Sequence, residues 1–207
     1  MKVLLLNGST RKNGCTYLAL SEVAKALNAE GVETEIIQMG GGPVRDCIGC
    51  NGCAGKGRCV FGDDMANEII AKAQQADGFV FGSPVYYAHP SGQILSLLDR
   101  VFYAGGSAFA HKPGAAIVTA RRAGTTASVD ALNKYLLDAQ MPVVSSTYWN
   151  MVFGPAPELV ERDKEGLQTM RNLGRNMAWL LKCIHAGAGQ GVAPPTAETG
   201  TWTNFNR

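Results

Sequence analysis

Residues 2–16 read KVLLLNGSTRKNGCT, an apolar run followed by a loop rich in glycine, hydroxyl and basic side chains. The run Val3–Leu6 is typical of a buried strand, and the loop Asn7–Gly14 separates it from an amphipathic stretch, Cys15–Glu30. In that stretch, apolar residues recur at helical spacing on one face: Leu20, Val23, Ala24 and Leu27. The opening of the chain therefore predicts a strand, a glycine-containing loop and a helix.

The alternation of strand and helix continues along the chain. Further strands are predicted at residues 32–38, 79–81, 115–119 and 143–148, and further helices begin near residue 63, at residue 91 and after a loop at residues 121–126. A long last helix carries apolar residues at helical spacing: Leu167, Met170, Leu173, Met177 and Leu181. Five strand–helix units with nearly continuous apolar strands predict an α/β fold, a doubly wound five-stranded parallel sheet for which we expect the strand order 2-1-3-4-5.

Such a sheet binds its ligands beyond the carboxyl ends of the strands, where the winding direction reverses. In the expected strand order, this point lies between the first and third strands. The loops that would meet there are residues 7–15 and 82–91, with residues 121–126 beside them.

Composition limits the class of protein. The chain has 207 residues, of which 46% are apolar and 17% charged, with a net charge of +2. These values fit a globular protein with a sizeable core and exclude a disordered chain. The small net charge argues against a nucleic-acid partner, and no stretch approaches the roughly 18 apolar residues of a membrane span. Because the apolar start is also too short for a signal peptide, we expect a cytoplasmic protein.

The chain is expected to form one domain and a tail. The domain spans residues 1–186 and contains a cysteine-rich loop at residues 40–62, inserted after the second strand. Residues 187–207 show no periodicity and end with Trp202 and Phe205. These aromatic residues either dock on a neighbouring subunit or belong to a frayed terminus.

The loop after the first strand has the features of an anion site. It lacks the Gly-Lys-Ser/Thr of a P-loop and the G-x-G-x-x-G of dinucleotide sites. It does place Gly8 and Gly14, the hydroxyls of Ser9, Thr10 and Thr16, and two cations at a helix N-terminus, whose N–H groups favour a phosphate. We expect a terminal monophosphate there; the alternative is a hydroxyl-rich helix cap without a ligand.

The loop after the third strand offers an aromatic surface at the same edge. Pro84 stiffens the backbone, and Tyr86 and Tyr87 provide flat, amphipathic side chains, although one of the two would also fit the core. In the neighbouring loop, Arg121 and Arg122 either favour a negative charge on a bound cofactor or form a solvated pair.

Four cysteines lie within thirteen residues, CIGCNGCAGKGRC, which we call the cysteine segment (residues 47–59). The spacing C-x2-C-x2-C-x5-C is close to the ferredoxin pattern, but its last gap is five residues and Val60 stands where a proline would follow. An iron–sulfur cluster needs four converging thiolates, and the interspersed glycines allow tight turns. Zinc, a disulfide pair or reduced thiols without a metal remain as alternatives.

These motifs resemble those of a known family. Gly8-Ser9-Thr10-Arg11 with Gly14-x-Thr16, followed by Gly82-Ser83-Pro84-Val85-Tyr86-Tyr87 and Ser91-Gly92, is similar to the flavodoxin-like NAD(P)H-dependent FMN reductases. The cysteine segment resembles the iron–sulfur flavoprotein branch of that superfamily. The resemblance covers residues 1–151 and is most specific in these three segments.

The resemblance implies FMN as cofactor, NAD(P)H as electron donor, and a set of binding residues. The FMN phosphate would lie on the first loop, the isoalloxazine along residues 84–87, and its other edge along residues 119–124. Where relatives often carry Ser or Asn this chain has Cys15, whose backbone N–H would make the contact because a thiol is a weak donor. The predicted cofactor-binding residues are Ser9, Thr10, Arg11, Asn13, Gly14, Cys15, Thr16, Pro84, Val85, Tyr86, Tyr87, Thr119, Ala120, Arg121, Arg122 and Gly124.

The resemblance also implies that the four cysteines of the segment ligate one [4Fe–4S] cluster: Cys47, Cys50, Cys53 and Cys59. The expected reaction is hydride transfer from NAD(P)H to FMN, which then reduces a small acceptor such as a quinone or flavin, or reduces the cluster in single-electron steps. The expected assembly is a homodimer or homotetramer, without nucleic acid or membrane. The alternatives are a flavodoxin-like electron carrier, a dehydrogenase of the same branch acting on an amino-cyclohexadiene acid, and a zinc-stabilised interaction module without flavin.

No side chain is predicted to act as a nucleophile or general acid. Asp63 and Asp64 fit a helix cap better than an acid–base pair. Cys183, on the last helix beside apolar residues, is expected to be buried. Of the three histidines, only His89 lies in a loop where it would touch a substrate.

Overall fold

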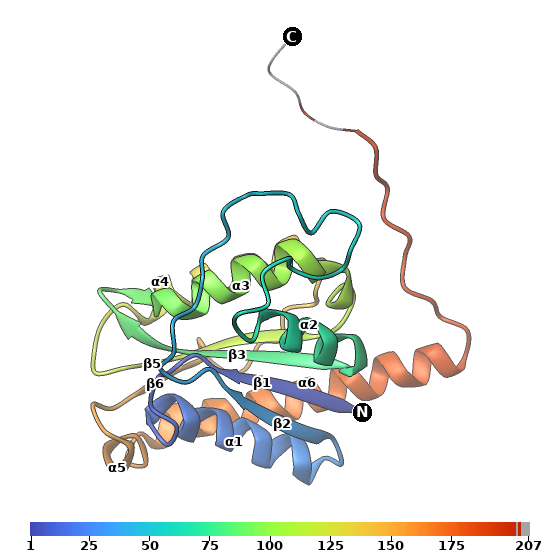
Figure 1. The fold of residues 1–207 in the computed structure, drawn as a ribbon. Helices are drawn as coiled ribbons and strands as arrows, with labels where there is room; N and C mark the ends of the chain where they lie inside the picture. The colour runs from blue at the N-terminus through green and yellow to red at the C-terminus, as the bar shows by residue number, and fades with distance from the viewer. Residues whose placement is uncertain (202, 204–207) are drawn as a thin grey trace.

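A mostly parallel sheet lies between two layers of helices in the computed structural model, which describes residues 1–201 and 203 (Figure 1). Its strands are β1 (Lys2–Asn7), β2 (Glu33–Gln38), β3 (Gly78–Tyr86), β4 (His89–Pro90), β5 (Gly114–Ala120) and β6 (Met151–Phe153). Its helices are α1 (Cys15–Ala29), α2 (Ala66–Gln75), α3 (Gly92–Gly105), α4 (Thr125–Asp138), α5 (Pro157–Val160) and α6 (Lys164–Gly189), with a short 3-10 turn at Gly106–Ala108. The predicted α/β class is therefore confirmed.

The strand count was predicted wrongly. The sheet has six strands, ordered β2-β1-β3-β5-β6, and the extra strand β4 pairs antiparallel with β3, off this path. The sheet therefore differs from the expected five strands in the order 2-1-3-4-5, because β4 adds a strand and shifts the numbering of the strands after it. Two residues, one of them a proline, carry no periodicity that would reveal a strand, so the β3–β4 hairpin was missed.

The last strand was also misplaced. Residues 143–148 form no strand: Val143 makes one isolated bridge to Gly114, and β6 begins only at Met151. The hydroxyl of Ser146 donates to the carbonyl of Tyr148 at 2.7 Å and accepts from its N–H at 3.4 Å. Such local side-chain bonds hold the backbone in a turn and prevent it from joining a strand ladder.

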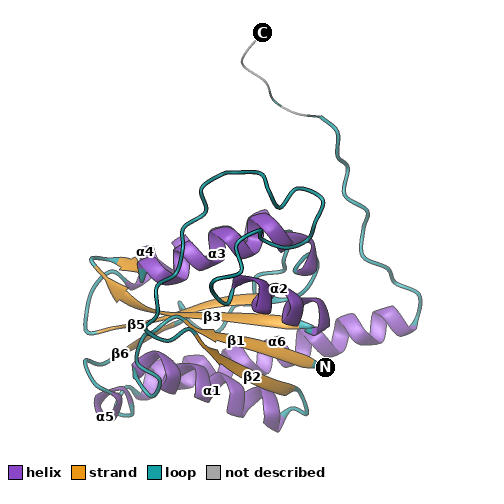
Figure 2. Ribbon diagram, in the orientation of Figure 1, coloured by secondary structure: helices purple, strands orange, loops and turns teal. Residues whose placement is uncertain are grey.

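Alternating burial along the strands explains the two helical layers. Leu4 and Leu6 of β1 belong to a core with helices α2, α3 and α4, whereas Val3 and Leu5 belong to a core with α1 and α6. Figure 2 shows these helix layers on opposite faces of the sheet. Because residues 3–6 of β1 are buried on both faces of the sheet, all four are apolar, as is typical of parallel strands.

The helix α6 extends beyond the sheet (Figure 1). Its residues Leu167, Met170, Leu173, Met177 and Leu181 are buried as predicted. Cys183 is exposed, contrary to prediction, because it follows the last buried turn. The helix continues to Gly189, past the expected tail boundary at residue 187. Trp202 and Phe205 lie outside the described residues.

Residues 39–65, all of them described, contain no helix or strand and connect β2 to α2. They include the cysteine segment. Among the described helices, none combines the length and apolarity needed to cross a membrane.

Candidate functional site

The loop after β1 is held in place by side chains at its base. The N–H of Ser9 donates to the Asn7 carboxamide at 3.2 Å, and the N–H of Arg11 donates to the Ser9 hydroxyl at 3.2 Å. From β2, Gln38 accepts from the Asn7 amide at 2.5 Å and donates to the Ser9 carbonyl at 2.6 Å. These bonds fix a turn that leads directly to α1.

Gly8 allows this loop to approach β3 and α3 closely. Its N–H donates to the Gly82 carbonyl at 2.8 Å, and its carbonyl accepts from the Ser91 hydroxyl at 2.9 Å. A Cβ at Gly8 would lie 2.6 Å from Ile94 Cδ1 and 2.8 Å from the Gly82 oxygen. Since real contacts are never so short, only glycine fits here without a shift of the neighbours.

The N-terminus of α1 is not capped by a side chain of the described residues. Its N-cap residue is Gly14, and the first-turn N–H groups of a helix have no intrahelical partner. The partial positive charge of these groups favours an anion. The alternative interpretation, a hydroxyl-rich cap without a ligand, therefore loses its main support.

Two side chains of the first turn of α1 contact other elements. The hydroxyls of Thr16 and Thr119 lie 2.9 Å apart, and both residues are buried. Cys15 Sγ is 3.5 Å from the Gly154 carbonyl, which accepts its S–H. Partial burial raises the pKa of the Cys15 thiol, so this group is protonated at neutral pH.

The β3–β4 hairpin has an unusual turn. Tyr87 and Ala88 have φ of 49° and 61°, the left-handed region that L-residues avoid. Val85 and Tyr86 pair with Pro90 and His89 on either side, so the two positive φ angles close a hairpin of type I′ character. Tyr87 is fully exposed at the tip, whereas Tyr86 is about half exposed. Neither tyrosine is in the core.

These elements meet around a pocket of about 260 Å³ at the carboxyl edge of the sheet, which we call the carboxyl-edge pocket. Ten predicted residues line it: Ser9, Arg11, Cys15, Thr16, Pro84, Val85, Tyr86, Thr119, Ala120 and Arg121. Six predicted residues are not in this lining: Thr10, Asn13, Gly14, Tyr87, Arg122 and Gly124. Two arginines and no acidic residue are among its described lining residues, which gives the pocket a positive character.

Gly154 and Pro155 also line the carboxyl-edge pocket and were not predicted. They follow β6, so misplacing the last strand moved this loop away from the expected site. The signal was the apolar triplet Met151–Phe153 followed directly by Gly-Pro, a pair typical of a loop. Gly124 does not line the pocket but is the N-cap residue of α4, with φ of +85°. A Cβ at this position would lie 2.4 Å from Ala88 Cα, so only glycine lets the loop pack against the hairpin.

A second pocket, the cysteine pocket, is lined by all four cysteines of the cysteine segment. Its volume is about 20 Å³, enough for about one water molecule. Cys47 and Cys50 are exposed, Cys53 is partly buried and Cys59 is buried. Within residues 1–201 and 203, no group of three or more Cys, His, Asp or Glu side chains is placed to hold a metal ion. The four soft donors thus fit a cluster chemically, but the outer three must move to converge on one.

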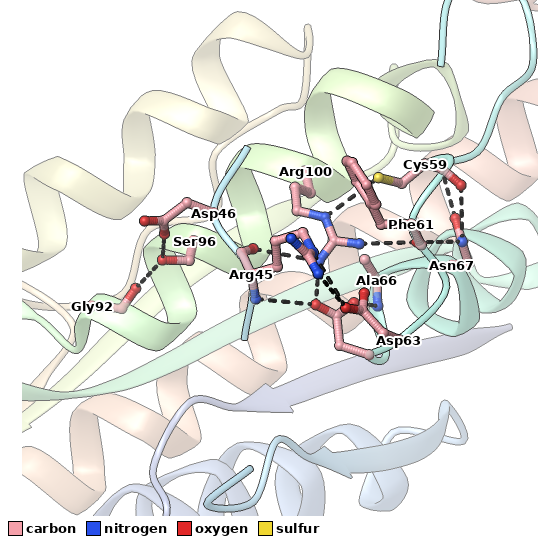
Figure 3. Close-up of polar contacts among 11 residues, drawn as sticks. Arg45, Asp46, Cys59, Phe61, Asp63, Ala66, Asn67, Gly92, Ser96 and Arg100 are labelled. Atoms are coloured by element: carbon pink, nitrogen blue, oxygen red, sulfur yellow. Dashed lines mark hydrogen bonds and ion pairs between the residues drawn. The ribbon is translucent and has the colours of Figure 1, made fainter. Parts of the chain in front are cut away.

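Helix α3 holds the chain around the cysteine segment with a polar stripe, which consists of Gln93, Ser96, Arg100 and Tyr103. Gln93 donates to the Gly42 carbonyl at 2.9 Å, Ser96 donates to Asp46, and Tyr103 donates to Asn51 at 2.8 Å. Spacings of three and four residues place all four on one side of the helix. Figure 3 shows Ser96 directed toward Asp46, next to the cysteine segment, and Arg100 directed toward Cys59.

Arg100 is the centre of these contacts and was not predicted. Its side chain is buried in an ion pair with Asp64, and its Nε lies 3.4 Å from Cys59 Sγ (Figure 3). Burial alone would lower the pKa of Arg100, but the bonds to Cys59 and Asp64 outweigh this effect and leave its pKa raised. The available signal was an arginine between the inward residues Leu97 and Val101 of an amphipathic helix.

Of the paired aspartates, Asp64 fulfils the predicted helix cap in part, and both aspartates also bind arginines. Asp63 binds Arg45 at 2.8 Å, and Asp64 binds Arg100. The N-cap residue of α2 is Met65, which makes no side-chain capping bond, although Asp64 does accept from the Ala66 N–H at 3.1 Å. His89 is the histidine predicted to touch a substrate. It lines a groove with Tyr135 of α4 and does not line the carboxyl-edge pocket.

Comparisons with known proteins add a family relationship. Residues 1–156 match the model of a family described as NADPH-dependent FMN reductase. The chain is 35% identical over 192 residues to an iron–sulfur flavoprotein of Methanocaldococcus jannaschii, covering 89% of this chain and 99% of that protein. An iron–sulfur flavoprotein of Archaeoglobus fulgidus is 30% identical, over 83% of this chain and 86% of the relative.

Solved structures support the fold. A structure described as flavone reductase superposes with a TM-score of 0.68 at 20% identity, covering 89% of this chain and 64% of that one. A flavodoxin from the domain Archaea gives a TM-score of 0.61 at 15% identity, covering 88% of this chain and 99% of that one. At such low identity these likenesses establish the flavodoxin-like fold alone.

Proposed function

Because this chain belongs to the NADPH-dependent FMN reductase family and is an oxidoreductase, we propose that it binds FMN in the carboxyl-edge pocket and transfers electrons from NAD(P)H to a small acceptor. The acceptor class we propose is a quinone or a free flavin. The observation that carries this proposal is the geometry of one pocket, which joins an uncapped helix N-terminus and Arg11 to the rigid hairpin arm Pro84–Tyr86.

The residues of the pocket divide into two groups by chemistry. The N–H groups at the start of α1 and the guanidinium of Arg11 would bind the FMN phosphate. Tyr86 and Pro84 would support one side of the ring system, with Thr119 to Arg121 at its other edge. Cys15, neutral and bonded to Gly154, would contribute its backbone N–H.

Bound FMN supplies the redox chemistry, because a flavin accepts a hydride and releases electrons one or two at a time. The chain binds and orients the cofactor, and Arg121 places a positive charge in the pocket that favours an anionic reduced ring. No side chain is required as a nucleophile.

We also propose that Cys47, Cys50, Cys53 and Cys59 ligate one [4Fe–4S] cluster. Support comes from the four soft donors that line one pocket and from the iron–sulfur flavoproteins related to this chain. Zinc and free thiols remain the alternatives that the experiment separates.

The experiment is anaerobic purification followed by counts of FMN, iron and sulfide per chain. About one FMN with near four irons and four sulfides supports both proposals, FMN without iron removes the cluster, and a chain that takes up no FMN overturns the flavin site. Steady NAD(P)H oxidation with a quinone distinguishes an enzyme from an electron carrier.

A matched pair of variants tests the phosphate site. Arg11→Gln removes a charged donor from the pocket, and we expect FMN affinity to fall by about tenfold or more. Lys12→Gln is the control, because Lys12 is exposed and does not line the pocket. Equal affinities for the two variants would contradict the assignment.

A further inference from the structure

Arg100 ties together the two ends of the cysteine segment. Its Nη1 lies 3.4 Å from the Arg45 carbonyl, two residues before Cys47. Its Nη2 donates to the Phe61 carbonyl at 3.0 Å, two residues after Cys59. One side chain from α3 therefore closes the loop that carries all four thiols.

Cys59 differs from the other three cysteines because every polar group it has is bonded. Its N–H donates to the Asn67 carboxamide at 2.8 Å, and its carbonyl accepts from the Asn67 amide at 3.0 Å. Its sulfur accepts from Arg100 Nε. Cys47 and Cys50 are exposed, by contrast, in a glycine-rich stretch with left-handed turns at Gly49 and Asn51. One ligand position is thus fixed before any metal binds, and the outer positions are adjustable.

The contact to the sulfur is charge-assisted. Arg100 is 2% exposed, and Asp64 and the two carbonyls occupy the remaining nitrogens of its fork. Its Nε–H is the donor directed at the sulfur. Hydrogen bonds to sulfur, net charge and exposure are the factors by which a protein sets the reduction potential of an iron–sulfur cluster.

We propose that Arg100 is the positioning residue of the cluster site: it fixes Cys59 as the first ligand and, through the Nε–H···S bond, raises the reduction potential of the cluster. This inference rests on the proposed cluster. Asp64 serves the same site indirectly, because it holds the guanidinium at the orientation that directs Nε toward Cys59.

The test compares Arg100→Lys with Gln93→Leu. Lysine retains a positive charge beside Asp64 but lacks the planar fork that reaches the sulfur and both carbonyls. Gln93→Leu removes a bond of the same polar stripe, to the Gly42 carbonyl, at a residue that does not line the cysteine pocket. FMN content and a cooperative thermal transition establish that each variant is folded.

The readouts are the reduction potential of the cluster, measured by spectroelectrochemical titration, and the rate of iron loss to a chelator. We expect R100K to have a lower potential than the wild type and to lose iron about 10- to 100-fold faster. Q93L should match the wild type in potential. If R100K loses its cooperative transition, the double variant Arg100→Gln with Asp64→Asn, which removes both charges of the ion pair, is measured in its place.

The outcomes separate the two claims. A folded R100K with the wild-type potential overturns the inference, even if iron is lost faster, because a purely structural contact would explain that loss. A wild-type chain that takes up FMN but no iron and sulfide on anaerobic reconstitution overturns the proposed cluster and the inference with it.

Discussion

The hydroxyl of Thr16, in the first turn of α1, lies 2.9 Å from the hydroxyl of Thr119, near the end of β5. Neither residue is more than 4% exposed. The bond joins the first turn of α1 to β5, a strand on the far side of β3, so it links two walls of the carboxyl-edge pocket.

Thr119→Val should destabilise the protein, because it leaves the buried Thr16 hydroxyl without its partner. We expect the free energy of unfolding to fall by about 1–3 kcal/mol, measured by urea denaturation. Thr34→Val is the control, since its bond to Asn28 is exposed and its loss should cost less than about 0.5 kcal/mol. Equal effects at positions 119 and 34 would show that the buried Thr16–Thr119 bond contributes no more to the free energy of unfolding than the exposed Thr34–Asn28 bond.

Gly8→Ala should destabilise the fold and weaken FMN binding. The added Cβ would lie 2.8 Å from the Gly82 oxygen, a backbone atom that moves only with β3. We expect a loss of about 1–3 kcal/mol in the free energy of unfolding, typical of overpacking. Gly41→Ala, with nothing within 4 Å of its Cβ, should leave stability and FMN affinity nearly unchanged. A Gly8→Ala chain as stable as Gly41→Ala would refute the close approach.

Ala88→Gly should stabilise the protein. Ala88 has φ of 61°, a left-handed conformation that costs an L-residue about 1–2 kcal/mol and costs glycine little. After the greater entropy loss of glycine, we expect a net gain of about 0.5–1 kcal/mol. The same change at Ala71, exposed within α2, should instead cost about 1 kcal/mol. In urea denaturation, Ala88→Gly should therefore have a higher midpoint than Ala71→Gly. A lower midpoint for Ala88→Gly would contradict the prediction.

Glu35 should make stability dependent on acid pH. Bonds from Lys2, at 2.8 Å, and from Lys72 lower the pKa of Glu35 below its ordinary value of 4.5. A carboxylate with a lowered folded-state pKa stabilises the protein above its unfolded-state pKa, and this contribution is lost as the pH falls through the folded-state pKa. Glu35→Gln should therefore lower the free energy of unfolding at pH 7 by at most about 1 kcal/mol.

The difference between wild type and Glu35→Gln should shrink as the pH falls below about 4.5, in urea titrations from pH 7 to pH 3. Glu68→Gln is the control, because Glu68 is 58% exposed on its side chain and 3.7 Å from Lys72. A difference that persists unchanged to pH 3 would exclude the lysine contacts as its cause.

The sequence was most informative where burial on both faces dictates residue type. The strands β1, β3 and β5 have apolar central runs, so the sequence predicts them, and the loops that follow them contain most residues of the carboxyl-edge pocket. Arg11, Pro84, Tyr86 and Thr119 line it as expected. Periodicity is a strong signal when each residue of a strand or helix faces either a core or solvent.

The features that were missed depend on contacts between distant segments. The position of β6 follows from the Ser146 turn and from pairing with β5, and neither is visible in local hydrophobicity. Arg100 makes these contacts only when α3 packs beside residues 45–64, which lie 36 to 55 residues earlier in the chain. Cys183 has apolar neighbours in sequence, but its helix has already passed the edge of the core.

Helix α3 connects both sites within one rigid element. Ser91, its N-cap, bonds the loop after β1 at Gly8, and Arg100 bonds the cysteine segment nine residues later. At about 1.5 Å and 100° per residue, these contacts are separated by roughly 14 Å and two and a half turns. An insertion or deletion of a single residue between them would rotate the guanidinium by about 100° away from Cys59. The two contacts therefore fix the number of residues between Ser91 and Arg100.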